Sequence, residues 1–141
     1  MRCANNTFIL KAPNGKYIKT PDGHGELYTK TDDRIPKGVF AAEEQDTGLF
    51  IIKSVERVEA TGRGYWVGTN GVYGLRILAI SKGGMGTWDK FRVLNQDDGS
   101  VVFKTFHDRY VNLEVYEGDK MRMVGKSTII NQDTKFIPEC V

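Results

Sequence analysis

The fold is decided by TFILKAPNGKYI, residues 7–18, in which an apolar run ends in a lysine and an aromatic residue follows six positions later. The same phrase returns in residues 49–67 as LFIIK before GYWV, and in residues 101–111 as VVFK before DRYV. Two landmarks share nearly one period, with intervals of 49 and 44 residues for Tyr17, Trp66 and Tyr110, and of 51 and 45 for Phe40, Phe91 and Phe136. Self-similarity at this period predicts three copies of one structural unit.

Each copy contains four short runs rich in β-branched and aromatic residues, separated by turns of Gly, Asn, Asp and Pro, with no long helical stripe. This composition predicts strands and turns. Units at about residues 7–48, 49–99 and 100–141 would give twelve strands in a single all-β domain. We therefore expect a β-trefoil, a closed six-stranded barrel capped by three hairpins, because three units around an axis remove the edges that one unit leaves exposed.

The repeated landmarks are expected to form the core of this barrel. The three phenylalanines should be buried at pseudo-threefold positions, and so should Tyr17, Trp66 and Tyr110. The three lysines that end the apolar runs alternate with inward residues and should point outward: Lys11, Lys53 and Lys104. Because Trp66 follows Lys53 by 13 residues rather than six, the second unit carries a predicted seven-residue insertion that lengthens a surface hairpin.

The composition narrows the classes of partner. With 141 residues, 40% of them hydrophobic, the chain is long enough for one core. A net charge of only +2 argues against a nucleic-acid partner, which calls for a concentrated basic field. No apolar run reaches the length of a membrane span, and the polar N-terminal region does not fit a secretory signal. We expect a soluble protein, cytoplasmic or secreted without a recognisable signal peptide.

Two cysteines lie at opposite ends of the sequence, Cys3 and Cys140. Such sparse cysteine usage is typical of a reducing compartment and predicts two free thiols. However, a trefoil begins and ends in neighbouring strands, so the two side chains should lie close together and a disulfide stays open as the alternative.

No catalytic constellation is present in the sequence. The only histidines are His24 and His107, and the G-x-S-x-G, H-E-x-x-H and C-x-x-C motifs do not occur. The glycines of GTNG and GGMG precede no helix that could bind a phosphate. We expect a protein that is not an enzyme and that needs neither a metal nor a cofactor.

The repeated phrase resembles the units of fascin-like β-trefoils and of small β-trefoil lectins, including the mussel type. The resemblance rests on FILKAPNGKYI (8–18), GTWDKFRVL (86–94) and GSVVFKTFHDRYVNL (99–113), and it covers nearly the whole chain. It implies the trefoil fold and two different activities. Fascins bundle actin through tandem trefoils, whereas the lectins bind sugars. The ricin-type Q-x-W motif and the His-Pro and Gly-Gly signatures of mussel-type turns are absent, so no particular sugar is carried over.

Sugar binding requires planar polar groups that bond to neighbouring hydroxyls, together with an aromatic face for the apolar side of the ring. The turns of the first unit supply the richest set: Asp22, His24, Glu26, Tyr28, Asp32, Asp33 and Arg34. The third unit supplies a second set: Asn112, Glu114, Tyr116 and Asp119. In the second unit the corresponding residues are better explained as solvated turns: Asn70, Tyr73, Lys82 and Trp88.

The sequence favours a single-domain lectin that binds glycans at up to three surface sites, dominated by the first unit, and that could dimerise. The alternative is a fascin-like module that binds actin, and a cytokine-like receptor ligand comes third.

Overall fold

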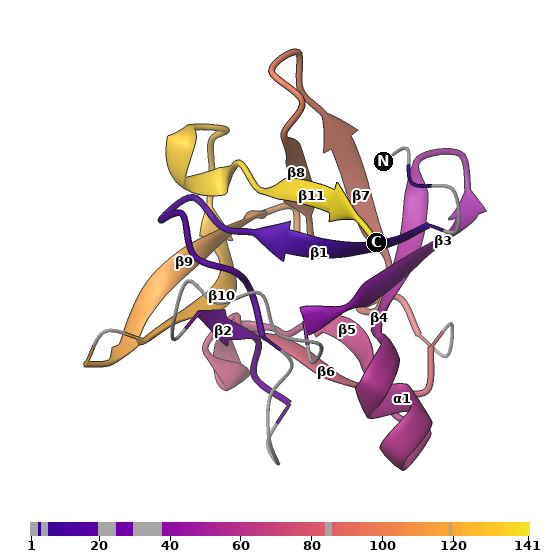
Figure 1. Ribbon diagram of the computed structural model, residues 1–141. Helices are drawn as coiled ribbons and strands as arrows, with labels where there is room; N and C mark the ends of the chain where they lie inside the picture. Colours follow the sequence, from indigo (N-terminus) through magenta and orange to yellow (C-terminus); the bar gives the residue numbers. More distant parts are fainter. Residues whose placement is uncertain (1–2, 4–5, 20–24, 30–37, 84–85, 119) are drawn as a thin grey trace.

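The structure is a computed structural model that describes residues 3, 6–19, 25–29, 38–83, 86–118 and 120–141 (Figure 1). The first unit contains β1 (Thr7–Lys11), β2 (Tyr28–Thr29) and β3 (Phe40–Asp46). The second contains β4 (Leu49–Ser54), α1 (Val55–Thr61), β5 (Tyr65–Gly68), η2 (Gly71–Tyr73), β6 (Ile77–Ser81) and β7 (Phe91–Asn95). The third contains β8 (Val101–Lys104), β9 (Tyr110–Glu117), β10 (Lys120–Ser127), η3 (Gln132–Thr134) and β11 (Ile137–Cys140).

Six of these strands form a closed barrel. β1 pairs with β11 and β3, β3 with β4, β4 with β7, and β7 with β8, all antiparallel. The ring closes where the amides of Val101 and Phe136 each donate to the other residue's carbonyl, at 2.7 and 2.9 Å. The predicted all-β trefoil is therefore confirmed. Eleven of the twelve expected strands form in the described residues, while the remaining segment pairs only through bridges at Tyr17 and Lys19.

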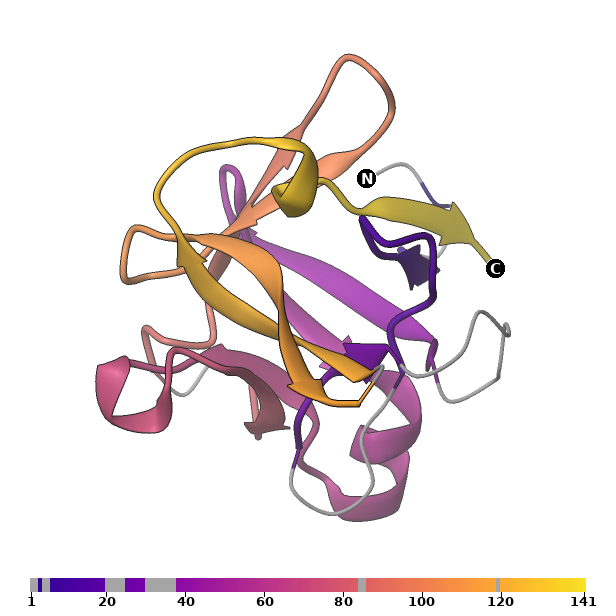
Figure 2. The same cartoon turned by 90° about the vertical axis from the view of Figure 1, so that its left-hand side faces the viewer.

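The hairpins at one end of the barrel meet in a threefold pattern. Three backbone bridges join the units pairwise: Tyr28 with Arg122, Leu78 with Glu26, and Val124 with Arg76. Within these pairs the residues Glu26, Arg76 and Arg122 occupy equivalent positions, at intervals of 50 and 46 residues. Figure 2 shows the β9–β10 hairpin lying against β2, so the first and third units share one surface.

The barrel interior is built from the repeated aromatic residues. Phe40, Phe91 and Phe136 are all fully buried, which confirms the prediction for them. Trp66 is also fully buried, and its ring meets Phe40 at 5.2 Å and Phe103 at 5.5 Å between centroids, both edge to face. Such edge-to-face pairs add to the stabilisation that the burial of apolar area provides.

The other two aromatic landmarks are only half-buried, which corrects the prediction for Tyr17 and Tyr110. The backbone bridges pair Lys11 with Tyr17 and Lys104 with Tyr110, and in the second unit Lys53 with Tyr65. Tyr65 is thus the equivalent tyrosine, and Trp66 takes the inward position next to it. Two of the lysines lie over their paired tyrosine rings on the outside of the barrel, Lys53 at 6.0 Å and Lys104 at 5.5 Å.

The insertion in the second unit forms a helix, where the sequence predicted only an extended hairpin. Tyr65 follows Lys53 by 12 residues and the other two pairs are six apart, so the insertion adds six residues rather than seven. α1 ends at Gly62, whose positive φ of 74° suits glycine, and the Gly62 amide donates to the Val58 carbonyl. The Arg57 side chain fixes the helix to the barrel by donating to the Ala79 carbonyl at 2.7 Å.

The two chain ends are joined by a disulfide between Cys3 and Cys140, and the prediction of free thiols is wrong. Antiparallel pairing of β1 with β11 brings the ends together, and Phe8 lies opposite Cys140. The two Cα atoms are 5.2 Å apart, as the trefoil topology predicted. Figure 1 shows β1 and β11 lying side by side.

Candidate functional site

Five of the eleven predicted ligand-binding residues lie in the described part of the chain: Glu26, Tyr28, Asn112, Glu114 and Tyr116. The other six lie outside the described residues: Asp22, His24, Asp32, Asp33, Arg34 and Asp119. The sequence assigned the five to separate sites in the first and third units. The structure brings four of them together on one surface, because β2 pairs with β10 and places Tyr28 opposite Arg122.

A chain of ion pairs runs beneath this surface. Glu26 accepts from Arg76 at 2.6 Å and from Arg122 at 3.4 Å, so a single carboxylate links two arginines from the other two units. The Glu26 side chain is only 11% exposed. A carboxylate so enclosed orients Arg122 and offers little surface to a ligand.

The second carboxylate of the chain is more accessible. Glu114 accepts from Arg122 at 3.2 Å and also pairs with Lys126, while 29% of its side chain remains exposed. The hydrogen bond from Lys126, and then that from Arg122, lowers the pKa of Glu114 below its ordinary value. Glu114 is therefore ionised at neutral pH and can accept hydrogen bonds from a ligand.

Two tyrosines border these charged groups. The Lys120 ammonium lies 5.2 Å from the centre of the Tyr28 ring and 5.9 Å from that of Tyr116. The Arg122 guanidinium lies 5.0 Å from the Tyr116 ring, and Tyr116 is 41% exposed. These cation–π contacts hold Lys120 between the two rings and Arg122 against the Tyr116 ring. We name the five residues that form this face the cap surface: Tyr28, Glu114, Tyr116, Lys120 and Arg122.

Asn112 has a structural role next to the cap surface. Its side-chain oxygen accepts from the backbone amides of Lys126 at 3.1 Å and Ser127 at 3.2 Å. These bonds lie at the irregularity in the β9–β10 pairing between Val124 and Ser127. Because the oxygen has two lone pairs and both are used, Asn112 has no acceptor left for a ligand.

Sequence reasoning missed Lys120 and Arg122. The repeat held a signal for Arg122, since Glu26, Arg76 and Arg122 each precede a fully buried residue of the cap: Leu27, Ile77 and Met123. Charged residues at three equivalent positions of one hairpin end indicate an ion-pair cluster near the threefold axis. The position of Lys120 between two tyrosines depends on the β2–β10 pairing and has no such signal.

The residues that the sequence weighed in the second unit are spread over several turns. Asn70 caps η2 by accepting from the Val72 amide at 3.0 Å, and Tyr73 is 52% exposed. The half-buried Trp88 ring stands edge-on to His107, with 4.8 Å between centroids. Lys82 is exposed.

Two further features are absent from the described part of the chain. In residues 3, 6–19, 25–29, 38–83, 86–118 and 120–141, no three His, Cys, Asp or Glu side chains cluster as metal ligands would. Over the same ranges, no helix has the length and apolar character that crossing a bilayer requires.

Comparisons with known proteins support the fold. No family model and no curated protein matches the chain. Among solved structures, it is similar over its whole length to the BEL β-trefoil in an apo crystal form, at 15% identity and a TM-score of 0.76, covering 97% of that chain. It is similar over 94% of its length to the designed threefold-symmetric protein ThreeFoil, at 12% identity and a TM-score of 0.75, covering 97% of that chain.

A third similarity is to a much larger protein. A mosquitocidal holotoxin matches 94% of the chain at 11% identity and a TM-score of 0.76, although the match covers only 16% of the toxin. The likeness to fascins and mussel-type lectins stays a resemblance of sequence. At these identities the comparisons establish the architecture alone, and the chain is a β-trefoil.

Proposed function

We propose that this protein is a lectin that binds glycans non-covalently at the cap surface. The observation that carries the proposal is the meeting of Tyr28 from the first unit with Glu114 and Tyr116 from the third, around Arg122. Two aromatic rings, a carboxylate and a guanidinium on one partly exposed face are the groups that recognise the apolar side and the hydroxyls of a sugar. The β-trefoil fold supports the proposal only as a scaffold, since function depends on the site.

The ion pairs make the polar groups of this face rigid. Arg122 is held by Glu26 and Glu114 on one side and by the Tyr116 ring on the other. A side chain that is already ordered loses little conformational entropy when a ligand binds. We therefore propose that a shallow site of few contacts is compensated by preorganisation, and that any stronger binding comes from more than one site or from dimerisation.

The disulfide indicates the redox environment in which the protein functions. A Cys3–Cys140 bridge persists in oxidising surroundings and is unusual in reducing ones. We propose that the protein is secreted rather than cytoplasmic, which also places it where glycans are displayed.

A glycan array, followed by titration of the best ligand, tests the proposal. Tyr116→Ala and Glu114→Gln should each weaken binding about tenfold to hundredfold, as expected for the loss of about 1.5–3 kcal/mol per charged or stacking contact. Tyr73→Ala is the matched control, because Tyr73 is also an exposed tyrosine but lies on η2 of the second unit. Its affinity should equal that of the wild type.

Actin co-sedimentation on the same samples tests the alternative. An array without any ligand, together with saturable pelleting on actin filaments, would replace the lectin with the fascin-like actin-binding module. Unchanged glycan affinity in both cap-surface variants would instead move the glycan site elsewhere on the trefoil.

A further inference from the structure

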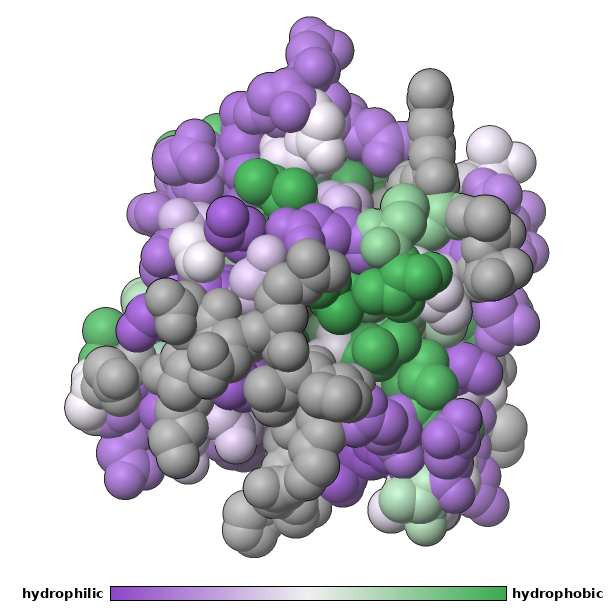
Figure 3. All heavy atoms as spheres, in the orientation of Figure 1, coloured by the Kyte–Doolittle hydropathy of each residue, from purple (hydrophilic) through white to green (hydrophobic). Residues whose placement is uncertain are grey.

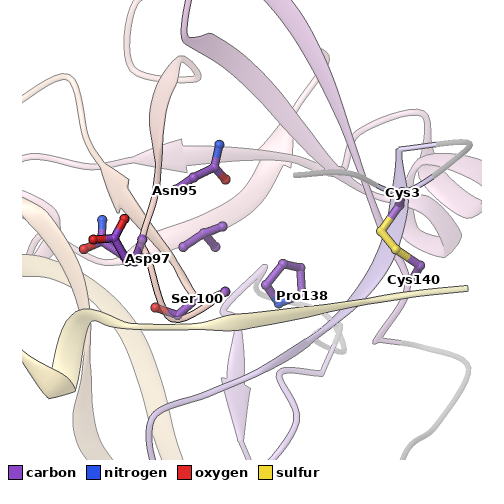
Figure 4. Close-up of a pocket in the computed structure, with 9 residues that line it drawn as sticks. Cys3, Asn95, Asp97, Ser100, Pro138 and Cys140 are labelled. Atoms are coloured by element: carbon purple, nitrogen blue, oxygen red, sulfur yellow. A yellow bond between two sulfur atoms is a disulfide. The ribbon is translucent and has the colours of Figure 1, made fainter.

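A cavity of about 430 Å³ lies between the β7–β8 turn and the disulfide-linked chain ends, on a different part of the barrel from the cap surface (Figure 4). Its volume is in the range of small-molecule sites, about 300–1,000 Å³. The residues that line it come from the β7–β8 turn and the adjoining strand ends, and from the disulfide and β11: Asn95, Gln96, Asp97, Gly99, Ser100, Val101, Cys3, Pro138 and Cys140.

The position of the cavity follows from the threefold architecture. Hairpin turns join β3 to β4 and β7 to β8 at the junctions between units. The third equivalent junction pairs β11 with β1, and there the Cys3–Cys140 disulfide stands in place of a turn. The cavity thus lies between a true turn and the junction at which the chain begins and ends.

The β7–β8 turn is held in one conformation by its own hydrogen bonds. The Gln96 amide donates to the Ser100 carbonyl at 2.9 Å, and the Gly99 amide to the Gln96 carbonyl at 3.2 Å. The Asp98 carboxylate accepts from the Ser100 amide and hydroxyl, at 3.0 and 2.6 Å, and from Lys135 at 3.3 Å. Asp98 therefore belongs to the turn and not to the cavity.

The carboxylate of the neighbouring Asp97 takes no part in these hydrogen bonds of the turn. Asp97 is exposed and lines the cavity, and within the described residues no hydrogen bond or ion pair engages its carboxylate. Figure 4 shows Asn95, Asp97 and Ser100 on the β7–β8 side, with Pro138 between them and the disulfide. In Figure 3 the residues over the β7–β8 turn, at the top, are hydrophilic.

The two walls thus have different chemistry. Residues with planar polar side chains line one wall, Asn95, Gln96 and Asp97, and the Gln96 side chain also donates to the Leu94 carbonyl at 3.2 Å. Pro138 and the disulfide line the other wall. A hydroxyl-rich ring has the matching character, because its hydroxyls bond to planar groups while its C–H face contacts apolar atoms. Among the described residues, the lining includes one carboxylate and no cation.

We propose that this cavity is a second binding site, for a hydroxyl-rich ligand of monosaccharide size that carries no negative charge. Asp97 accepts hydrogen bonds from the ligand's hydroxyl groups, or pairs with an ammonium group where the ligand has one. We expect no binding of an anionic sugar, because the Asp97 carboxylate would repel it and none of the described lining residues carries a compensating positive charge.

Titration of the oxidised, ¹⁵N-labelled protein with a neutral hexose, a hexosamine and a hexuronic acid tests this site. We expect saturable shifts of the backbone amides of residues 95–101 with the first two and none with the third. The hexosamine should bind about two- to fivefold more tightly than the hexose, which is the effect of one exposed ion pair. Asp97→Asn should abolish that difference.

Two controls separate this site from other effects. Asp46→Asn changes a carboxylate at the equivalent β3–β4 turn and should leave every affinity unchanged. Tyr116→Ala weakens binding at the cap surface but should leave the affinities read from the 95–101 amides unchanged, so the second site can be tested whether or not the cap surface binds glycans. The proposal fails if no ligand shifts the 95–101 amides at millimolar concentration, or if the hexuronic acid binds there as well as the hexose.

Discussion

Removing the disulfide should destabilise the protein more than any other small change at its surface. Cys3 and Cys140 are separated by 137 residues, so their bond closes almost the whole chain into a loop. In the chain-entropy account, a cross-link over such a loop lowers the entropy of the denatured state by an amount worth about 5 kcal/mol at 25 °C. Measured effects of disulfides are commonly smaller, about 2–4 kcal/mol. We expect the Cys3→Ala/Cys140→Ala variant to lose about 3–5 kcal/mol.

Urea unfolding at equilibrium, followed by tryptophan fluorescence, measures this loss because Trp66 is fully buried in the folded barrel. The double variant should unfold at lower urea concentration. It should also show a steeper dependence of the unfolding free energy on urea, since an open denatured chain exposes more surface than a cross-linked one. Wild-type protein in excess reductant is the control and should match the double variant in both quantities.

The native contacts of the chain ends are separate from the cross-link. Four residue pairs join β1 to β11, and the Tyr17 hydroxyl donates to Glu139 at 2.9 Å. These contacts persist in the double variant, so the expected loss belongs to the denatured state. A loss below about 1 kcal/mol with an unchanged urea dependence would refute the entropic reasoning, provided that mass spectrometry shows the bond intact in the wild type.

Three further predictions concern single residues. Phe40→Ala should cost about 3–5 kcal/mol of unfolding free energy in the same assay, because it leaves a cavity beside Trp66, and a cost below 1 kcal/mol would contradict the burial. Hydrogen bonds from the Ser100 side chain and then its amide lower the pKa of Asp98 to about 2. The ionised carboxylate therefore stabilises the fold above its unfolded pKa, and this contribution is lost as pH falls through about 2. Carboxyl NMR titration should show Ser100→Ala raising that pKa, and an unchanged value would exclude Ser100 as its cause. Glu26→Gln should destabilise the protein by about 1–3 kcal/mol, because it leaves two arginines without the carboxylate that they share. A Tm equal to that of the wild type would show that these ion pairs do not stabilise the cap.

The fold could be predicted because its core repeats. Phe40, Phe91 and Phe136 recur at nearly constant intervals, and each occupies an equivalent buried position in the barrel. The strand register within a unit could not be predicted from the repeated motif alone. The motif GYWV offers two adjacent aromatic residues, and only the pairing of Lys53 with Tyr65 shows that Trp66 is the inward one.

The helix α1 could not be predicted because it leaves no pattern in the sequence. It is seven residues long and none of its residues is buried, so no apolar stripe marks one face. Its stability comes instead from tertiary contacts such as that of Arg57 with the Ala79 carbonyl.

Three of the five cap-surface residues, Tyr28, Glu114 and Tyr116, were among the residues that the sequence predicted, but their arrangement was not. Glu114 and Tyr116 share one face of β9 by simple alternation, which the sequence shows. Their proximity to Tyr28, some 90 residues earlier, depends on the pairing of β2 with β10. Such contacts between units follow from the threefold closure of the barrel, and no local sequence motif predicts them.

The joined ends also determine what a protease could do to this molecule. Because Cys3 and Cys140 enclose almost every peptide bond, a single cut between them releases no fragment while the bridge is oxidised. A nick in an exposed segment, such as the C-terminal turn of α1, would leave both pieces covalently attached and packed in one barrel. Two cuts, or one cut together with reduction, are needed to separate any part of the segment between the two cysteines. The trefoil thus stays in one piece after a single backbone cleavage, because the disulfide as well as the packing of the barrel holds the two parts together.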